Sequence, residues 1–235
     1  MPYEPLARIA RSRSITGIRQ KVELAPLQDR IYHQLRAAFM AGEFSPQEPL
    51  VAKEIAARLG TSMMPVRDAL RRLETIGVIT ITPQRGSYVR RLTSTEMGEV
   101  AKMRALLESE AVTEACTHMT DHAFKEIKKI DTAIKRAVQQ SDLKEAIFLN
   151  AEFHHMIYRC SNMPFLCETV ENLWLRTGPY LKAVITSTQA PPVKKYFAHH
   201  AAILNGLAQR DAAAASSALL RDIRVGTKLY HAILD

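Results

Sequence analysis

The chain has 235 residues, of which 47% are hydrophobic and 6% aromatic, and its formal net charge is +8 at pH 7. The length suits two domains or one large domain, and the composition suits an all-helical soluble protein. No stretch approaches the length of a membrane span, and no apolar run follows the early charges as in a secretory signal. The chain has three cysteines and no C-x-x-C pair, which favours reduced thiols and a cytoplasmic location. Because no membrane span is evident, we expect no membrane partner.

The charge is unevenly distributed. Residues 1–22 hold five Lys or Arg against one acid, residues 23–92 hold ten against seven, and residues 93–235 hold seventeen against sixteen. Nearly all of the excess positive charge therefore lies in the first 92 residues, which favours a polyanionic partner at that end. We expect residues 1–22 to be a flexible basic arm that adds a weak electrostatic attraction.

Residues 50–77 predict two short helices joined by a tight turn. Leu50, Ile55 and Leu59 give the first helix an apolar stripe, and Gly60 ends it. Ser62 is a suitable N-cap for the second helix. The second helix buries one stripe and carries arginines on its other faces. The stripe comprises Val66, Ala69, Leu70 and Leu73, and the arginines are Arg67, Arg71 and Arg72.

Two short strands follow at 78–81 and 87–89, with a turn at 83–86 between them. Taken singly, each of these features is more often an exposed helix face or an ordinary helical hairpin. Together they have the layout of a winged helix-turn-helix, a module that places its second helix in the major groove of DNA.

From Thr93 onward the pattern is helical almost throughout. We expect helices near 95–118, 121–140, 142–160, 164–185, 194–209 and 212–233, with breaks at 141, 161–164, 189–192 and 210–211. The predicted fold class is therefore mainly α. A winged helix-turn-helix at 23–92 precedes an all-α antiparallel bundle of about six helices at 93–235.

The first of these domains resembles that of the GntR superfamily of bacterial transcription regulators, and within it the FadR-type subfamily. The matching residues are Pro65 to Leu73, which read PVRDALRRL, and Arg85-Gly86 in the wing. The family pattern adds a first helix near 27–41. The resemblance implies that seven positions contact DNA, namely Lys53, Ser62, Met63, Arg67, Arg71, Arg85 and Gly86.

The chain departs from the family pattern at two positions. The family usually has an arginine at the position of Met63, and an arginine there suits bidentate recognition of guanine. Methionine cannot donate a hydrogen bond, so we expect a different operator base pair at that point. Val51 stands where the family often has a serine cap, which predicts a less sharply defined start for that helix.

Asn150 and His154 lie four residues apart and so project from one face of a helix. His200 and Asp222 lie on later helices. A bundle core that joined all four would offer nitrogen and oxygen ligands for Zn²⁺, Ni²⁺ or Mn²⁺. By spacing alone the pair is more often a chance arrangement, because the chain has eight histidines.

The segments around these residues resemble the FCD ligand-binding domain of FadR-type regulators. In many members an Asp and three His bind a divalent metal, and these positions map to Asn150, His154, His200 and Asp222. Asparagine is a poor ligand for transition metals, so the resemblance implies weakened affinity. The alternative is a metal-free polar pocket that still binds a ligand.

Effectors of the family are often small carboxylic acids, which a metal or an arginine would anchor. Arg104 matches an arginine that faces the pocket in some members, and Arg176 is a second candidate. For each arginine the alternative is a salt bridge on the helix surface, for instance between Arg104 and Glu108 at i,i+4.

The sequence therefore predicts a homodimeric regulator, most simply a repressor, that binds a palindromic double-stranded DNA operator. A small organic acid in the bundle would modulate this binding. Two other classes stay open, namely a metal-dependent helical hydrolase and a DNA-binding protein without an effector. No catalytic residues are assigned, because no general base, Ser-His-Asp set or phosphate loop is evident.

Overall fold

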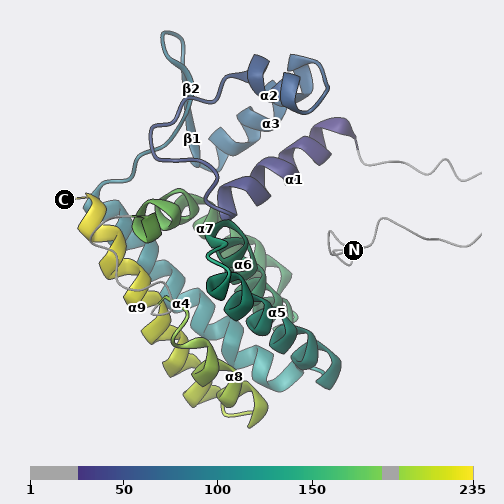
Figure 1. Cartoon of the computed structure of the whole chain (residues 1–235), viewed down its shortest axis with the longest axis vertical. Coiled ribbons are helices and arrows are strands. Elements are labelled where there is room, and N and C mark those ends of the chain that lie inside the picture. The colour runs from purple at the N-terminus through teal and green to yellow at the C-terminus, as the bar shows by residue number, and fades with distance from the viewer. Residues whose placement is uncertain (1–25, 187–195, 235) are drawn as a thin grey trace, which may run out of the picture.

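The computed structural model describes residues 26–186 and 196–234 as helices, strands and connections. The elements are α1 (Leu27–Met40), α2 (Ala52–Arg58), α3 (Met63–Thr75), β1 (Ile79–Thr82), β2 (Gly86–Val89), α4 (Ser94–His118), α5 (Asp121–Gln139), α6 (Leu143–Arg159), α7 (Pro164–Thr186), α8 (His200–Ala208) and α9 (Ala212–Leu234). Figure 1 shows α1–α3 and the hairpin stacked on one end of the bundle formed by α4–α9. The predicted fold class is confirmed.

The N-terminal domain is held together by the apolar stripe of α3. Val66, Ala69, Leu70 and Leu73 are all buried, and they share one hydrophobic core with α1 and β1. The hairpin pairs β1 with β2 antiparallel, from Ile79 opposite Val89 to Thr82 opposite Gly86. The tip of the wing projects away from the bundle (Figure 1).

The bundle begins with a capped helix. The Thr93 hydroxyl accepts a hydrogen bond from the backbone N–H of Glu96, and the Glu96 carboxylate accepts one from the backbone N–H of Thr93. This capping box satisfies two backbone donors that a helix start leaves without partners. The helix it opens, α4, runs alongside α9, while α5 lies against α6 (Figure 1).

Helix α7 belongs to both halves of the molecule. Leu175 is fully buried in the core of the N-terminal domain, although it lies in the middle of a bundle helix. A Cβ added at Gly178 would lie 2.2 Å from the carbonyl oxygen of Phe39 on α1, so only glycine allows this close packing. The ion pair between Arg36 and Glu171, at 2.6 Å, fastens the same two helices. The two domains therefore share an extensive, specific contact.

The helix predicted to begin at residue 194 begins at His200, because residues 196–199 form turns. Tyr196 is buried and Phe197 packs against the core, so both fit the helical pattern without being helical. The other helix ends differ from the prediction by only one or two residues. The predicted arm at 1–22 and the break at 189–192 lie outside the described residues.

Candidate metal centre and DNA-binding surface

Three of the four predicted metal ligands meet in the centre of the bundle. His154 of α6, His200 of α8 and Asp222 of α9 each offer one ligand atom, and these atoms all lie within 4.8 Å of one another. His154 Nε2 lies 3.4 Å from Asp222 Oδ2. The two imidazoles are almost fully buried, so the sequence-distant helices create a compact N/O cluster that water reaches poorly.

Several polar atoms of this cluster form no hydrogen bond with the part of the chain that the structure describes. His154 Nε2, His200 Nε2 and Asp222 Oδ1 are buried, and none forms a hydrogen bond with the described residues. Buried polar atoms are rarely left unsatisfied, because each costs about 1–3 kcal/mol. Two imidazole nitrogens and a carboxylate oxygen at this spacing suit a divalent transition metal, so the residues present fit such an ion.

The protonation states of the cluster also suit a cation. Burial lowers the pKa of His200, which favours the neutral imidazole that can coordinate a metal. Burial opposes ionisation of Asp222, but the interaction with His154 and the nearby imidazole of His200 outweigh it and lower the pKa of that carboxyl. The cluster thus combines a charged carboxylate with a neutral ligand.

Asp131 on α5 completes the surroundings of His200. Its Oδ1 lies 3.4 Å from His200 Nδ1, and its Oδ2 forms an ion pair with Lys135 at 2.7 Å. A carboxylate behind one ring nitrogen orients the imidazole and leaves Nε2 to face the cluster. Sequence reasoning missed Asp131. The signal was an acid within the buried stripe formed by Ile127 and Ile134.

Asn150, the fourth predicted ligand, lines a cavity of about 40 Å³ together with Asp222 and Arg104. A site of this size holds on the order of one to three water molecules. It therefore has room for an ion and its immediate ligands, or for one very compact group. A larger organic acid does not fit there without displacing side chains.

Arg104 is buried, but its charge is already paired. Its Nε donates to Glu108 at 2.6 Å, and its guanidinium lies 4.2 Å from the centre of the Trp174 ring. Burial opposes the charged guanidinium, but Glu108 outweighs that effect and raises the pKa of Arg104. The i,i+4 salt bridge between Arg104 and Glu108, which was the alternative prediction, is therefore present. It is buried beside the cavity and does not lie on the helix surface.

Glu108 is the centre of a hydrogen-bond network that sequence reasoning missed. Besides Arg104, its fully buried carboxylate accepts hydrogen bonds from Tyr158 Oη at 2.5 Å and Trp174 Nε1 at 2.9 Å. Tyr158 Oη also lies 3.2 Å from His154 Nδ1. The network therefore orients His154 from behind. The only sequence signal for this network was the presence of polar residues, Arg104 and Glu108, within the buried stripe of α4.

Arg176, the second effector candidate, points toward the N-terminal domain. Its Nη2 donates to the carbonyl oxygen of Ile76 at 2.9 Å, and it is not among the residues that line the bundle cavity. Burial and the nearby charge of Arg90 lower its pKa. The structure thus associates Arg176 with the domain contact.

All seven predicted DNA-contacting residues are exposed on the N-terminal domain. Ser62 occupies the N-cap of α3, but its side chain makes no capping hydrogen bond. Its hydroxyl and the amides of the first turn are thus open to a phosphate. Met63, the first residue of α3, is 41% exposed. Arg72, by contrast, packs over Tyr32 and pairs with Asp29, so it stabilises the domain.

These features define a class: a winged helix-turn-helix protein whose helical bundle carries a buried polar centre. Residues 27–89 match the profile of the bacterial regulatory proteins of the gntR family, and residues 99–225 match the FCD domain. The FCD match alone covers more than half of the chain, which therefore belongs to the GntR-family transcription regulators with an FCD domain. The hydrolase alternative is excluded, because the family and its relatives are regulators.

Two curated relatives come from Escherichia coli strain K12. The HTH-type transcriptional regulator McbR is 28% identical over 191 residues, covering 81% of this chain and 86% of McbR. The repressor RspR is 25% identical over 199 residues, covering 85% and 86%. Among solved structures, E. coli McbR/YncC has a TM-score of 0.85 at 25% identity, covering 90% of this chain and all of that one.

No described helix is long and apolar enough to cross a membrane.

Proposed function

We propose that this regulator binds a palindromic operator as a homodimer and that its bundle holds a divalent metal, Zn²⁺, Ni²⁺ or Mn²⁺, which governs the response to a small carboxylate. The observation that carries this proposal is the convergence of buried ligand atoms of His154, His200 and Asp222, several of which form no hydrogen bond with the described residues. Bound there, the ion would supply the positive charge that a carboxylate requires.

The chain's own residues hold and orient the proposed site. Asp131 and the Glu108–Tyr158 pair fix the two imidazoles from behind. Asn150 lies beside the cluster and offers an amide oxygen. Because Glu108 neutralises Arg104, this arginine would position Trp174 and Thr177 and leave the carboxylate to the ion.

Helix α7 contacts both the polar centre of the bundle and the N-terminal domain, so a change in the bundle could alter DNA binding. Trp174 borders the polar centre, whereas the next residue, Leu175, is buried in the core of the N-terminal domain. A ligand that shifts α7 would therefore change how the winged domain is held. In a dimer, both recognition helices must meet half-sites on one face of DNA, so a modest shift would alter operator affinity.

The test combines elemental analysis with operator binding. A DNA fragment would be selected from random duplexes, and its affinity measured by fluorescence anisotropy with Zn²⁺, Ni²⁺ or Mn²⁺ and with formate, acetate or glycolate. We expect one divalent ion per chain and a change in operator affinity with at least one acid. His154→Ala and Asp222→Ala should remove the ion, whereas His122→Ala, at an exposed position on α5, should retain it.

Equal metal content in the wild type and in His154→Ala would refute the metal site. If the protein binds the operator and no acid changes its affinity, with or without metal, the carboxylate effector is refuted. The protein would then be a DNA-binding protein without such an effector. Operator binding by a monomer would refute the dimer.

A further inference from the structure

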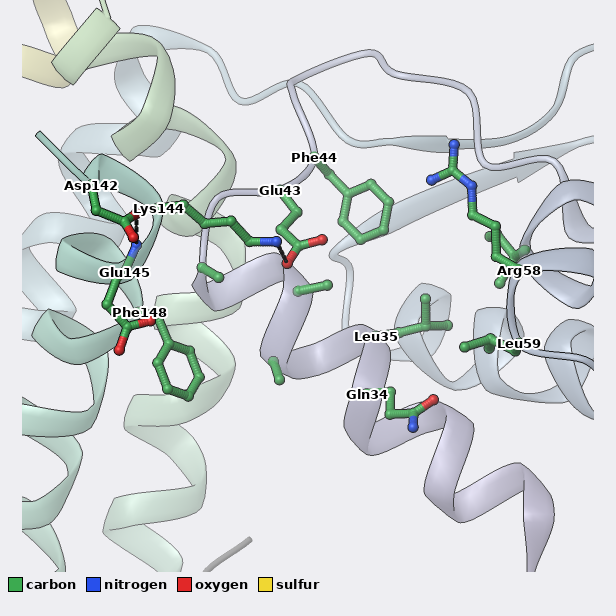
Figure 2. Close-up of a pocket in the computed structure, with 14 residues that line it drawn as sticks. Gln34, Leu35, Glu43, Phe44, Arg58, Leu59, Asp142, Lys144, Glu145 and Phe148 are labelled. Carbon is green, nitrogen blue, oxygen red and sulfur yellow. Dashed lines mark hydrogen bonds and ion pairs between the residues drawn. The ribbon is translucent and has the colours of Figure 1, made fainter. Parts of the chain in front are cut away.

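A cleft of about 490 Å³ lies between the DNA-binding domain and the bundle, where α1 and α2 face the beginning of α6 (Figure 2). Ligand pockets in proteins commonly measure roughly 300–1,000 Å³. The cleft is within this range and is more than ten times larger than the cavity of about 40 Å³ in the bundle. Among these two cavities, only the cleft can take an organic molecule with a ring or a branched chain.

The inner walls of the cleft are apolar. Ala37 and Ala38 on α1 and Ala41, the C-cap residue of α1, have small side chains that leave the space open. Larger side chains border it from both domains, and these are Leu35, Phe44, Ile55, Leu59 and Phe148. Leu59 is 38% exposed, so it offers apolar surface to a ligand in the cleft. A ligand with an apolar body would remove this surface from water.

Most charged groups at the rim of the cleft already have partners. Lys144 on α6 forms an ion pair with Glu43 at 2.9 Å and so ties the two domains across the rim. The Asp142 carboxylate caps α6 by accepting a hydrogen bond from the backbone N–H of Glu145. Arg58 differs, because its exposed guanidinium forms no ion pair or hydrogen bond with the described residues. Figure 2 shows it beside Phe44.

We propose that this interdomain cleft is a second ligand site, separate from the bundle centre, and that it binds an aromatic or branched aliphatic monocarboxylate. The carboxylate pairs with the guanidinium of Arg58, whose fork of N–H donors matches two carboxylate oxygens. The apolar body lies on the alanines of α1 between Phe44 and Phe148. The carboxylate of Glu145, for which the described residues provide no ion pair, lies on the other wall and disfavours a second negative charge on the ligand.

A ligand in this position would touch both domains at once. Arg58 and Leu59 lie at the end of α2 in the winged domain, and Phe148 lies on α6, the helix that carries Asn150 and His154. Filling the cleft therefore fixes the orientation of the winged domain relative to the bundle. The binding part of this proposal does not depend on a bound metal or on a dimer.

Calorimetric titration of the full chain, without DNA, tests the binding. The probes are phenylacetate and its neutral analogue phenylacetamide. We expect saturable binding of phenylacetate, with phenylacetamide bound at least about tenfold more weakly, because the neutral amide cannot form a charge-assisted hydrogen bond with Arg58. Arg58→Gln should abolish this preference for the acid, and Ala38→Phe should abolish binding of both probes by filling the cleft.

Arg136→Gln is the matched control, since it removes an exposed arginine of α5 that does not line the cleft. It should bind phenylacetate like the wild type. Circular dichroism would check that Ala38→Phe is folded, and Arg58→Gln alters only an exposed side chain. The proposal is overturned if neither probe binds, or if both variants bind phenylacetate like the wild type. It is also overturned if affinity falls as protein concentration rises, since a second copy of the chain would then occupy the cleft.

Discussion

Arg176 on α7 donates a hydrogen bond from Nη2 to the backbone carbonyl oxygen of Ile76, the C-cap residue of the recognition helix α3, at 2.9 Å. Two residues earlier on α7, Trp174 Nε1 donates to Glu108 in the centre of the bundle. Less than one helical turn thus separates a contact to the end of α3 from a contact to the polar centre. Helix α7 therefore contacts both the N-terminal domain and the polar centre of the bundle through neighbouring residues.

Arg176→Ala should weaken this connection. The carbonyl of Ile76 would lose a donor in a part-buried site, so we expect the free energy of unfolding to fall by about 1 kcal/mol. Chemical denaturation measures this change. Arg136→Ala, at an exposed position on α5, should cost almost nothing. If both variants are equally stable, the hydrogen bond to Ile76 does not contribute to domain docking.

Gly178→Ala should separate α7 from α1. The new Cβ would lie 2.2 Å from the Phe39 carbonyl oxygen, and this backbone cannot move aside as a side chain can. Overpacking of this kind typically costs about 1–3 kcal/mol, which thermal or urea unfolding would detect. Gly98→Ala on α4 is the control, because nothing lies within 4 Å of the added atom. It should be neutral or stabilise the helix by up to about 1 kcal/mol.

If Gly98→Ala lost as much stability as Gly178→Ala, this prediction would be contradicted. The loss would then come from replacing glycine by alanine in a helix and not from the contact between α7 and α1.

Asn150→Asp should strengthen the proposed metal site. A carboxylate is a better ligand for Zn²⁺ or Mn²⁺ than an amide oxygen, and Asn150 lies beside Asp222. We expect the metal affinity, measured with a competing chelator, to rise on the order of tenfold, equivalent to about 1.4 kcal/mol. Asn205→Asp adds the same charge at an exposed position on α8 and should leave affinity unchanged. Equal affinity in all three proteins would place Asn150 outside the coordination sphere.

Met63→Arg should change the base preference of the operator. Met63 begins α3 and is exposed, so an arginine there could reach the major-groove edge of guanine in a bidentate contact. Such a contact discriminates by about 1–3 kcal/mol, which competition binding with single base-pair variants would resolve. Met64→Arg adds the same charge next to it and should raise affinity for all sequences similarly. Identical base preferences in Met63→Arg and the wild type would mean that this position does not read DNA.

The winged helix-turn-helix was predictable because its pattern is local. The stripe from Val66 to Leu73 and the turn at Gly60 each depend on residues within two helical turns. The same holds for Asn150 and His154, whose shared face follows from their i,i+4 spacing alone. The sequence therefore determined the order of elements, the exposed side chains that we expect to contact DNA and two residues of the polar centre.

Tertiary packing decided what these residues meet. Glu108 binds Trp174 across 66 positions of the chain, and Asp131 lies behind His200, so neither contact has a local signature. Arg176 was expected at the effector pocket, yet it faces Ile76, because burial of Leu175 in the winged domain fixes the rotation of α7. Periodicity defines which face of a helix is apolar, but only the packing of several helices determines which partner covers each face.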